Sequence, residues 1–263
     1  MMSTARKLGT MSLLSTLISV QLRQLLLQRK TKALAVVQLM PLIGAAVYVL
    51  FENIDGLTMF SGVAESLLLP FLVPLAAIFY GGPAVVDEME GRTLTYLTLR
   101  PISKATLFVG KVIAGTIMAL AIVLIPMLLL FGLCMFQSMD FAESLPVLGR
   151  VLAAASCGII AYSAIFAALG ALFASSLLAS ILYFVAFEMV MATLPVLELL
   201  SIRFHLRTIA GFTSSDRLGF LDRMVLDQPL HVEWWVSLLI IGVLTALGIA
   251  GGSMIFKEKQ YLV

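Results

Sequence analysis

Charged residues are scarce in this sequence, and their scarcity excludes most water-soluble folds. Only 12% of the 263 residues are charged, whereas 61% are apolar; a typical soluble domain has roughly 25% and 45–50%. One water-soluble core cannot hold so much apolar surface, and the apolar residues come in long uncharged blocks. The net charge of +2, with basic residues spread along the chain, gives no reason to expect a nucleic-acid partner.

The sequence also lacks a phosphate-binding loop. Gly110-Lys111 resembles the end of one, but the pattern Gly-x4-Gly-Lys-Ser/Thr needs glycine at 105 and a hydroxyl at 112, where Ala105 and Val112 stand. We therefore expect no ATP, magnesium or other cofactor to bind to this chain itself. Any ATP hydrolysis belongs to another polypeptide.

Motifs for covalent chemistry are missing as well. The sequence contains neither Gly-x-Ser-x-Gly nor His-Glu-x-x-His. Cys134 and Cys157 both fall in apolar blocks, where a thiol behaves as a small hydrophobe. His205 and His231 are too far apart for their spacing to indicate a metal site. We expect neither catalytic residues nor a bound metal.

Six apolar blocks are long enough to cross a bilayer as helices, because about 20 residues rising 1.5 Å each span a hydrocarbon core of roughly 30 Å. The blocks are residues 33–51, 61–80, 107–136, 150–173, 177–197 and 234–256. The uncharged run from 151 to 187 is too long for one crossing, so we divide it at Ser175 and Ser176. No linker divides the chain, and residues 1–263 predict one all-α domain with six transmembrane helices.

Basic residues indicate the orientation, since they are retained on the cytoplasmic side. With the N-terminus inside, 12 of the 17 basic residues are cytoplasmic: Arg6, Lys7, Arg23, Arg29, Lys30, Lys32, Arg92, Arg100, Lys104, Lys111, Lys257 and Lys259. The first two outer loops carry only acidic charges, namely Glu52, Asp55, Asp140 and Glu143. Both termini are therefore predicted to be cytoplasmic. The outer segment 198–233 carries four arginines, but it is long enough to translocate regardless of charge.

The loop at 83–104, between the second and third blocks, has the most informative order of residues. It opens with an acidic cluster, which suits a helix N-terminus, and Pro101 disfavours helical geometry in the residue before it. These features predict a short amphipathic cytoplasmic helix. From physics alone, an ordinary polar inner loop is an equally good interpretation.

The pattern Glu-x-Gly-x-Thr, a hydrophobic pair, Pro-x-Ser with a basic residue, and then Gly-Lys resembles the ABC-2-type exporter permeases. The matching residues are Glu88, Glu90, Gly91, Thr93, Tyr96, Leu97, Pro101, Ser103, Lys104, Gly110 and Lys111. Arg92 departs from the common form, in which the glycine and threonine are adjacent. The resemblance implies that this loop is a coupling helix that docks on a separate ATPase. The ATPase-coupling residues would be Asp87, Glu88, Glu90, Gly91, Arg92, Thr93, Arg100, Pro101 and Lys104.

The same resemblance implies the assembly and the location. Two permease copies would pair, as a homodimer or a heterodimer, and two ATPase subunits carrying ATP and magnesium would bind beneath them. The bacterial cytoplasmic membrane would be the site of action. The family exports many kinds of molecule, so the resemblance does not select a substrate.

Residues 11–32 predict an interfacial amphipathic helix instead of a signal peptide, because polar residues interrupt them at regular intervals. The apolar side comprises Leu14, Leu17, Ile18, Leu22 and Leu25, and the other side Ser15, Ser19, Arg23 and Lys30. The resemblance makes this an elbow helix that borders the ATPase through Arg23, Arg29 and Lys30. A membrane-surface anchor without a partner is the other interpretation.

Glu188 is the carboxylate predicted nearest to the middle of the membrane, where a charge is costly enough to indicate function. Tyr162 is predicted at the same depth, since each lies about 13 residues from the Ser175/Ser176 turn, roughly 20 Å along its helix. A hydrogen bond between them is geometrically possible. The pair either holds two helices together or lines the translocation path. An ion-coupled carrier or an intramembrane enzyme using Glu188 stays an alternative function.

Other residues give further expectations for the path. Glu65 is predicted near the outer interface, solvated, and is a further candidate for the path. Pro70, Pro74 and Pro126 remove backbone donors and predict kinks in the second and third crossings. The resemblance implies that segment 198–233 forms short re-entrant or outer helices that cap the exit.

Overall fold

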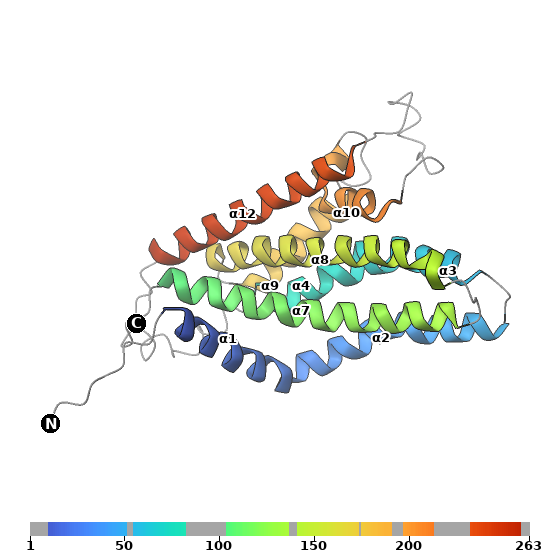
Figure 1. The fold of residues 1–263 in the computed structure, drawn as a ribbon. Coiled ribbons are helices and arrows are strands. Elements are labelled where there is room, and N and C mark those ends of the chain that lie inside the picture. Colours follow the sequence, from blue (N-terminus) through green and yellow to red (C-terminus); the bar gives the residue numbers. More distant parts are fainter. Residues whose placement is uncertain are drawn as a thin grey trace.

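The computed structural model describes residues 10–51, 55–82, 104–136, 141–173, 175–190, 197–212 and 232–258. Every regular element within these ranges is a helix, so the prediction of an all-α fold is confirmed (Figure 1). The long helices are α1 (Thr10–Leu27), α2 (Arg29–Phe51), α7 (Lys104–Met135), α8 (Phe141–Leu172) and α12 (Trp234–Glu258). The remaining elements are α3 (Gly56–Val63), η1 (Ala64–Leu72), α4 (Val73–Tyr80), α9 (Ser176–Tyr183), η2 (Phe184–Val190), η4 (Leu197–Leu200) and α10 (Ile202–Ala210).

Five helices in the described ranges are long and apolar enough to cross a membrane. They cover Arg29–Val47, Gly56–Tyr80, Thr106–Met135, Ser144–Leu172 and Trp234–Phe256. The sixth predicted crossing, 177–197, is described as a shorter apolar helix over Ser176–Val190. At 1.5 Å per residue this described part extends roughly 20 Å. Residues 191–196 lie outside the description, and Leu197, the predicted end of the crossing, is the first residue of the 3-10 turn η4.

The break between the elbow helix and the first crossing lies earlier than the predicted boundary at residue 32. α1 ends at Leu27 and α2 begins at Arg29. Thr31 explains the shift, because its Oγ1 donates to the carbonyl of Leu25 at 2.5 Å, and Gln28 N also donates to that carbonyl at 3.3 Å. These bonds take an acceptor that a continuous helix would use for its own ladder.

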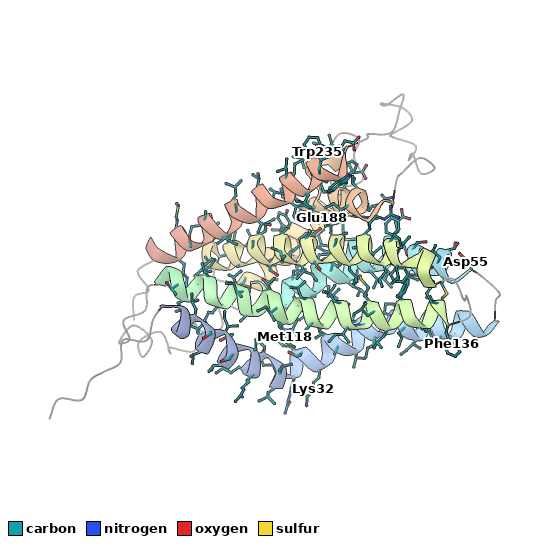
Figure 2. All side chains as sticks on the ribbon, viewed as in Figure 1. Lys32, Asp55, Met118, Phe136, Glu188 and Trp235 are labelled. Carbon is teal, nitrogen blue, oxygen red and sulfur yellow. The ribbon has the colours of Figure 1, made fainter. Side chains whose placement is uncertain are left out.

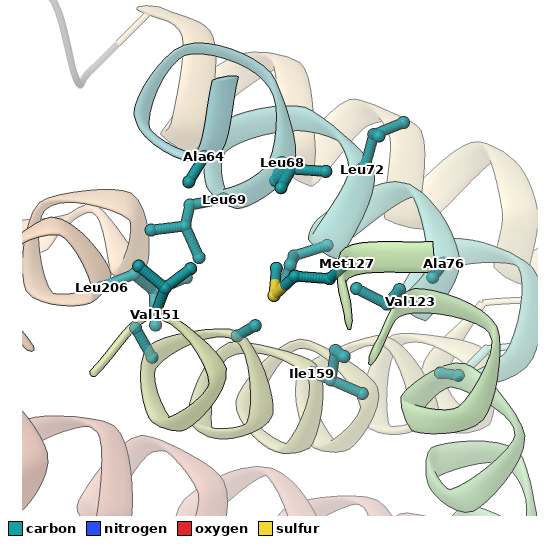
Figure 3. Close-up of a cluster of buried hydrophobic side chains, with 14 of the residues drawn as sticks. Ala64, Leu68, Leu69, Leu72, Ala76, Val123, Met127, Val151, Ile159 and Leu206 are labelled. Carbon is teal, nitrogen blue, oxygen red and sulfur yellow. The ribbon is translucent and has the colours of Figure 1, made fainter. Parts of the chain in front are cut away.

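The helices pack around one main apolar core between the second crossing, α7 and α8. Leu69, Met127 and Ile159 lie in it, and Leu206 of α10 enters from the side (Figure 3). Small residues bring the backbones close, as is usual where helices associate in lipid. A Cβ on Gly248 of α12 would lie only 3.0 Å from the backbone carbon of Ala164 in α8.

The ends of the helices gather at two ends of the bundle. Figure 1 shows the C-terminal ends of α4, α8 and α12 at the same end as the N-terminal ends of α1, α7 and α9. α3 and α10 lie at the opposite end. The loop at 83–103 therefore joins two helices at the end where α1 begins and α12 finishes, which is the arrangement predicted for the cytoplasmic side.

Candidate functional site

Most of the predicted coupling residues lie outside the described residues. They are Asp87, Glu88, Glu90, Gly91, Arg92, Thr93, Arg100 and Pro101. Lys104 is the first residue of α7, and its side chain is also outside the description. The structure does define the two helices, α4 and α7, between which this loop runs.

The C-terminal end of α4 packs closely against α8 and α9, because glycines at the contact leave no room for side chains. A Cβ on Gly170 of α8 would lie 2.8 Å from the carbonyl oxygen of Gly82, and one on Gly82 would lie 3.2 Å from Cβ of Ser176. A Cβ on Gly81 would lie 2.9 Å from Cα of Ser163. Side chains at Gly81 and Gly170 would collide with backbone, so the segment that enters the loop is held tightly.

The start of α7 is held by α1. A Cβ on Gly110 would lie 2.8 Å from Cδ2 of Leu17 and 3.2 Å from Cδ2 of Leu14. Leu25 is buried, while Arg23 and Arg29 are exposed and Lys30 is partly exposed. The apolar side of α1 therefore faces the bundle, as the sequence pattern predicts, and the cations point outward.

Glu188 binds the N-terminus of α10 near the other end of the bundle (Figure 2). Ser201 Oγ donates to Glu188 Oε2 at 2.6 Å, Ile202 N donates to Oε1 at 3.0 Å, and Arg203 N donates to Oε2 at 3.1 Å. The Glu188 side chain is buried. A helix N-terminus has free N–H groups and the positive end of the helix dipole. A carboxylate there accepts hydrogen bonds from those N–H groups and interacts favourably with the dipole. Glu188 thus ties η2 to α10.

Tyr162 lies close to this cluster without joining it. Its ring is fully buried and stacks on Phe166, with 5.7 Å between ring centroids. The hydroxyl lies close to the Glu188 carboxylate and interacts with it, but the two groups do not reach the distance and angle of a hydrogen bond. The geometry therefore differs from the expected Tyr162–Glu188 bond, because α10 folds back and supplies the donors to Glu188.

Glu65 forms a partly buried ion pair with α10. Arg207 Nη2 donates to Glu65 Oε1 at 2.6 Å, and the two side chains are 15% and 23% exposed, Arg207 first. Glu65 is therefore partly exposed, and the expectation that it is solvated misses its ion pair, because the partner lies 142 residues away in the sequence. This contact ties η1 to the same helix that Glu188 caps.

His205 joins α10 to α12 and η4. Its Nε2 lies 3.0 Å from the carbonyl oxygen of Leu199, and its Nδ1 lies 3.1 Å from Oγ of Ser237. A carbonyl oxygen only accepts, so Nε2 carries the proton and Nδ1 of a neutral ring accepts from the serine hydroxyl. Burial lowers the pKa of His205, and the hydrogen bond with Leu199 opposes that effect.

This geometry predicts that acid loosens α10. Because the pKa of His205 is lowered in the folded state, folded His205 binds fewer protons than the same residue in the unfolded chain. The free energy of unfolding therefore falls as the pH drops from the ordinary pKa of histidine toward the lowered pKa of the folded state. Hydrogen exchange of the α10 amides, corrected for intrinsic rate, should be faster at about pH 5 than at about pH 7. His205→Gln should remove most of this difference. An equally steep pH dependence in that variant would assign it to another group.

A family model described as ABC-2 family transporter protein matches residues 27–190, more than half of the chain. The chain belongs to the ABC-2 transporter family. The ABC-2 match runs from the start of α2 to the end of η2, so it includes loop 83–104 and Glu188. A search of curated proteins gives no match.

Membership and the apolar helices define the general role. The chain is a multi-pass membrane protein and a permease subunit of an ABC transporter, a type of system that includes an ATPase partner. Members of this family are typically the membrane subunit and not the ATPase. α10 and α12 lie beyond the matched residues.

Proposed function

We propose that this ABC-2 permease subunit works in an ATP-driven exporter of the bacterial cytoplasmic membrane. A separate ATPase binds loop 83–104 and the neighbouring α1, and ATP and magnesium bind in that ATPase. Two copies of the chain flank the translocation path, with two ATPase copies beneath them. The permease moves its substrate without covalent chemistry.

The proposal is carried by the tight packing of both helices that flank the loop. α4 is wedged against α8 and α9 through Gly82 and Gly170, and α7 is held by α1 through Gly110. Force applied to the loop is therefore passed to the packed elements, because closely packed interiors transmit strain. Arg23, near the end of α1, and Arg29, at the start of α2, are exposed and are available to a docked partner or to lipid headgroups.

Large exposed apolar faces support a bilayer and a second copy as partners. α2 exposes Val36, Met40, Ile43 and Val47, and α12 exposes Leu239, Val243, Leu247 and Met254. Only 11% of the most apolar window of α12 is buried inside the chain. Such continuous faces are not left in water. Lipid covers most of them, and the permease partner covers the part that borders the path.

Capture of the partner tests this proposal. The tagged full chain, purified from its native membranes in mild detergent, should retain a phosphate-loop ATPase and hydrolyse ATP. Alanine replacement of Thr93 and Arg100 together should reduce the retained ATPase. A purified chain that transports with no companion would overturn the proposal and favour an ion-coupled carrier. The contacts of the Glu188 oxygens with α10 support a structural role for that carboxylate.

Gly110→Leu should detach α1 from α7. The new side chain must displace Leu17 and Leu14 from the notch, and overpacking costs about 1–3 kcal/mol. Hydrogen exchange of the α1 amides in nanodiscs should accelerate roughly tenfold, since about 1.4 kcal/mol is a factor of ten. The retained ATPase should fall in parallel.

Gly132→Leu is the matched control on the same helix. A Cβ on Gly132 has no heavy atom within 4 Å among its described surroundings. In this variant the hydrogen-exchange rates of the α1 amides and the amount of retained ATPase should equal those of the parent. Equal effects of the two variants would show that α1 is not the element through which Gly110 acts.

A further inference from the structure

Two crossing segments depart from α-helical geometry within the described residues. η1 (Ala64–Leu72) and η2 (Phe184–Val190) are π-helical. In η1 the wide turn closes with Val73 N donating to the carbonyl of Leu68, five residues earlier. π-helical turns are rare in proteins overall, and many of those that occur lie at functional sites. Their length here, 9 and 7 residues, exceeds the single turn that is usual.

The two π segments contact each other and the same third helix. Phe71 of η1 packs edge-on against Phe184 of η2, with 6.1 Å between ring centroids. Each segment also carries one carboxylate that binds α10: Glu65 pairs with Arg207, and Glu188 caps the N-terminus. Both segments therefore contribute a carboxylate contact that holds α10, in addition to the packing of Ile202 and Leu206 in the core.

The sequence supplies a cause for the first of these turns. Pro70 lacks an N–H, and in an α-helix its ring collides with the carbonyl four residues earlier. A wider turn relieves that collision. Gln38 of α2 then fixes the junction with α4, because its Nε2 donates to the carbonyl of Leu72 at 2.9 Å. Pro74 lies in the first turn of α4, so Pro70 is the proline inside the π segment and can be replaced on its own.

We propose that η1 and η2 form a paired register switch that holds α10 closed over the outer end of the bundle. Reversion of a π turn to an α turn rotates the side chains on one side of it by about 100° relative to the other. Glu65 then leaves Arg207 and Glu188 leaves the N-terminus of α10. α10 stays attached to α12 through His205 and Ser237. The proposal rests on the proposed function in one respect, that release of α10 opens the exit.

The test measures access to α10 in the full chain in nanodiscs. Thr208, part-buried beside Arg207, is replaced by cysteine in a Cys134→Ala/Cys157→Ala background and labelled with a membrane-impermeant maleimide. Pro70→Ala should raise the labelling rate roughly tenfold, because the α-register no longer carries the proline penalty. Pro41→Ala is the control, since Pro41 lies in the α-helix α2. It should leave the rate within about twofold of the parent.

Charge variants test the Glu65–Arg207 ion pair separately. Glu65→Gln and Arg207→Gln should each raise labelling, and the exchanged pair Glu65→Arg/Arg207→Glu should restore the parent rate. An unchanged rate in Pro70→Ala alongside a raised rate in the charge variants would overturn the register switch and leave only a fixed ion pair. Unchanged rates throughout, or rapid labelling of the parent, would overturn the closed state of α10 itself.

A last arm separates this inference from the proposed function. In complex with its ATPase, vanadate trapping should raise labelling of the parent to the rate of Pro70→Ala. No rise in a complex that hydrolyses ATP would overturn the switch. Failure to isolate any ATPase would count against the proposed function and would leave the results on the chain alone standing.

Discussion

Glu88→Gln/Glu90→Gln should weaken binding of the ATPase by roughly a hundredfold or more. Under the proposed function these carboxylates dock on the partner, and hydrogen bonds to charged groups contribute about 1.5–3 kcal/mol each. ATP hydrolysis in the remaining complex should be uncoupled from movements of the permease. Titration of labelled ATPase against the permease in nanodiscs measures the loss.

Asp140→Asn/Glu143→Gln is the matched control, because it removes the same number of negative charges from the predicted outer side, where Glu143 lies in the first turn of α8. It should leave the ATPase affinity unchanged. If both double variants weaken binding alike, net charge and not the coupling segment controls the affinity. If neither does, the coupling segment is assigned wrongly.

Glu188→Gln should free the N-terminus of α10. The amide keeps one oxygen acceptor where the carboxylate used two, so at least one buried donor among Ser201, Ile202 and Arg203 loses its acceptor. Each orphaned donor costs about 1–3 kcal/mol. Hydrogen exchange of the Ile202 and Arg203 amides should accelerate roughly tenfold to a hundredfold, while α8 should be unaffected.

Tyr162→Phe is the control for this position. The Tyr162 hydroxyl meets no hydrogen-bond partner in the described part of the chain, so its loss should not release α10. The capping role would be contradicted if hydrogen exchange of the α10 amides were unchanged in Glu188→Gln but accelerated in Tyr162→Phe. It would instead connect the two residues directly, as the sequence alone suggests.

The crossings were predictable because their signal is local. A run such as 234–256 is apolar over the full thickness of a bilayer, and α12 covers it. The elbow helix was predictable for the same reason, since Leu14, Leu17 and Leu25 share one side of it. Its end was not, because the break depends on Thr31 donating to the carbonyl of Leu25.

The contacts of α10 could not be predicted from spacing. Counting residues from a turn places Glu188 at a depth, but it does not reveal that Ser201 and Ile202 return to the same depth. Glu65 and Arg207 are likewise far apart in sequence. Pro70, in the same crossing as Glu65, gives a sequence signal for a distorted helix there. It does not predict that the distortion is π-helical.

The proposed function requires loop 83–104 to face the cytoplasm and to bind an ATPase there. Thr95→Cys, in a background with Cys134 and Cys157 replaced by alanine, introduces a single cysteine that can be tested with an impermeant maleimide in intact cells and in inverted membrane vesicles. We expect labelling only in inverted vesicles, with protection when the ATPase is bound. Labelling in intact cells would contradict it.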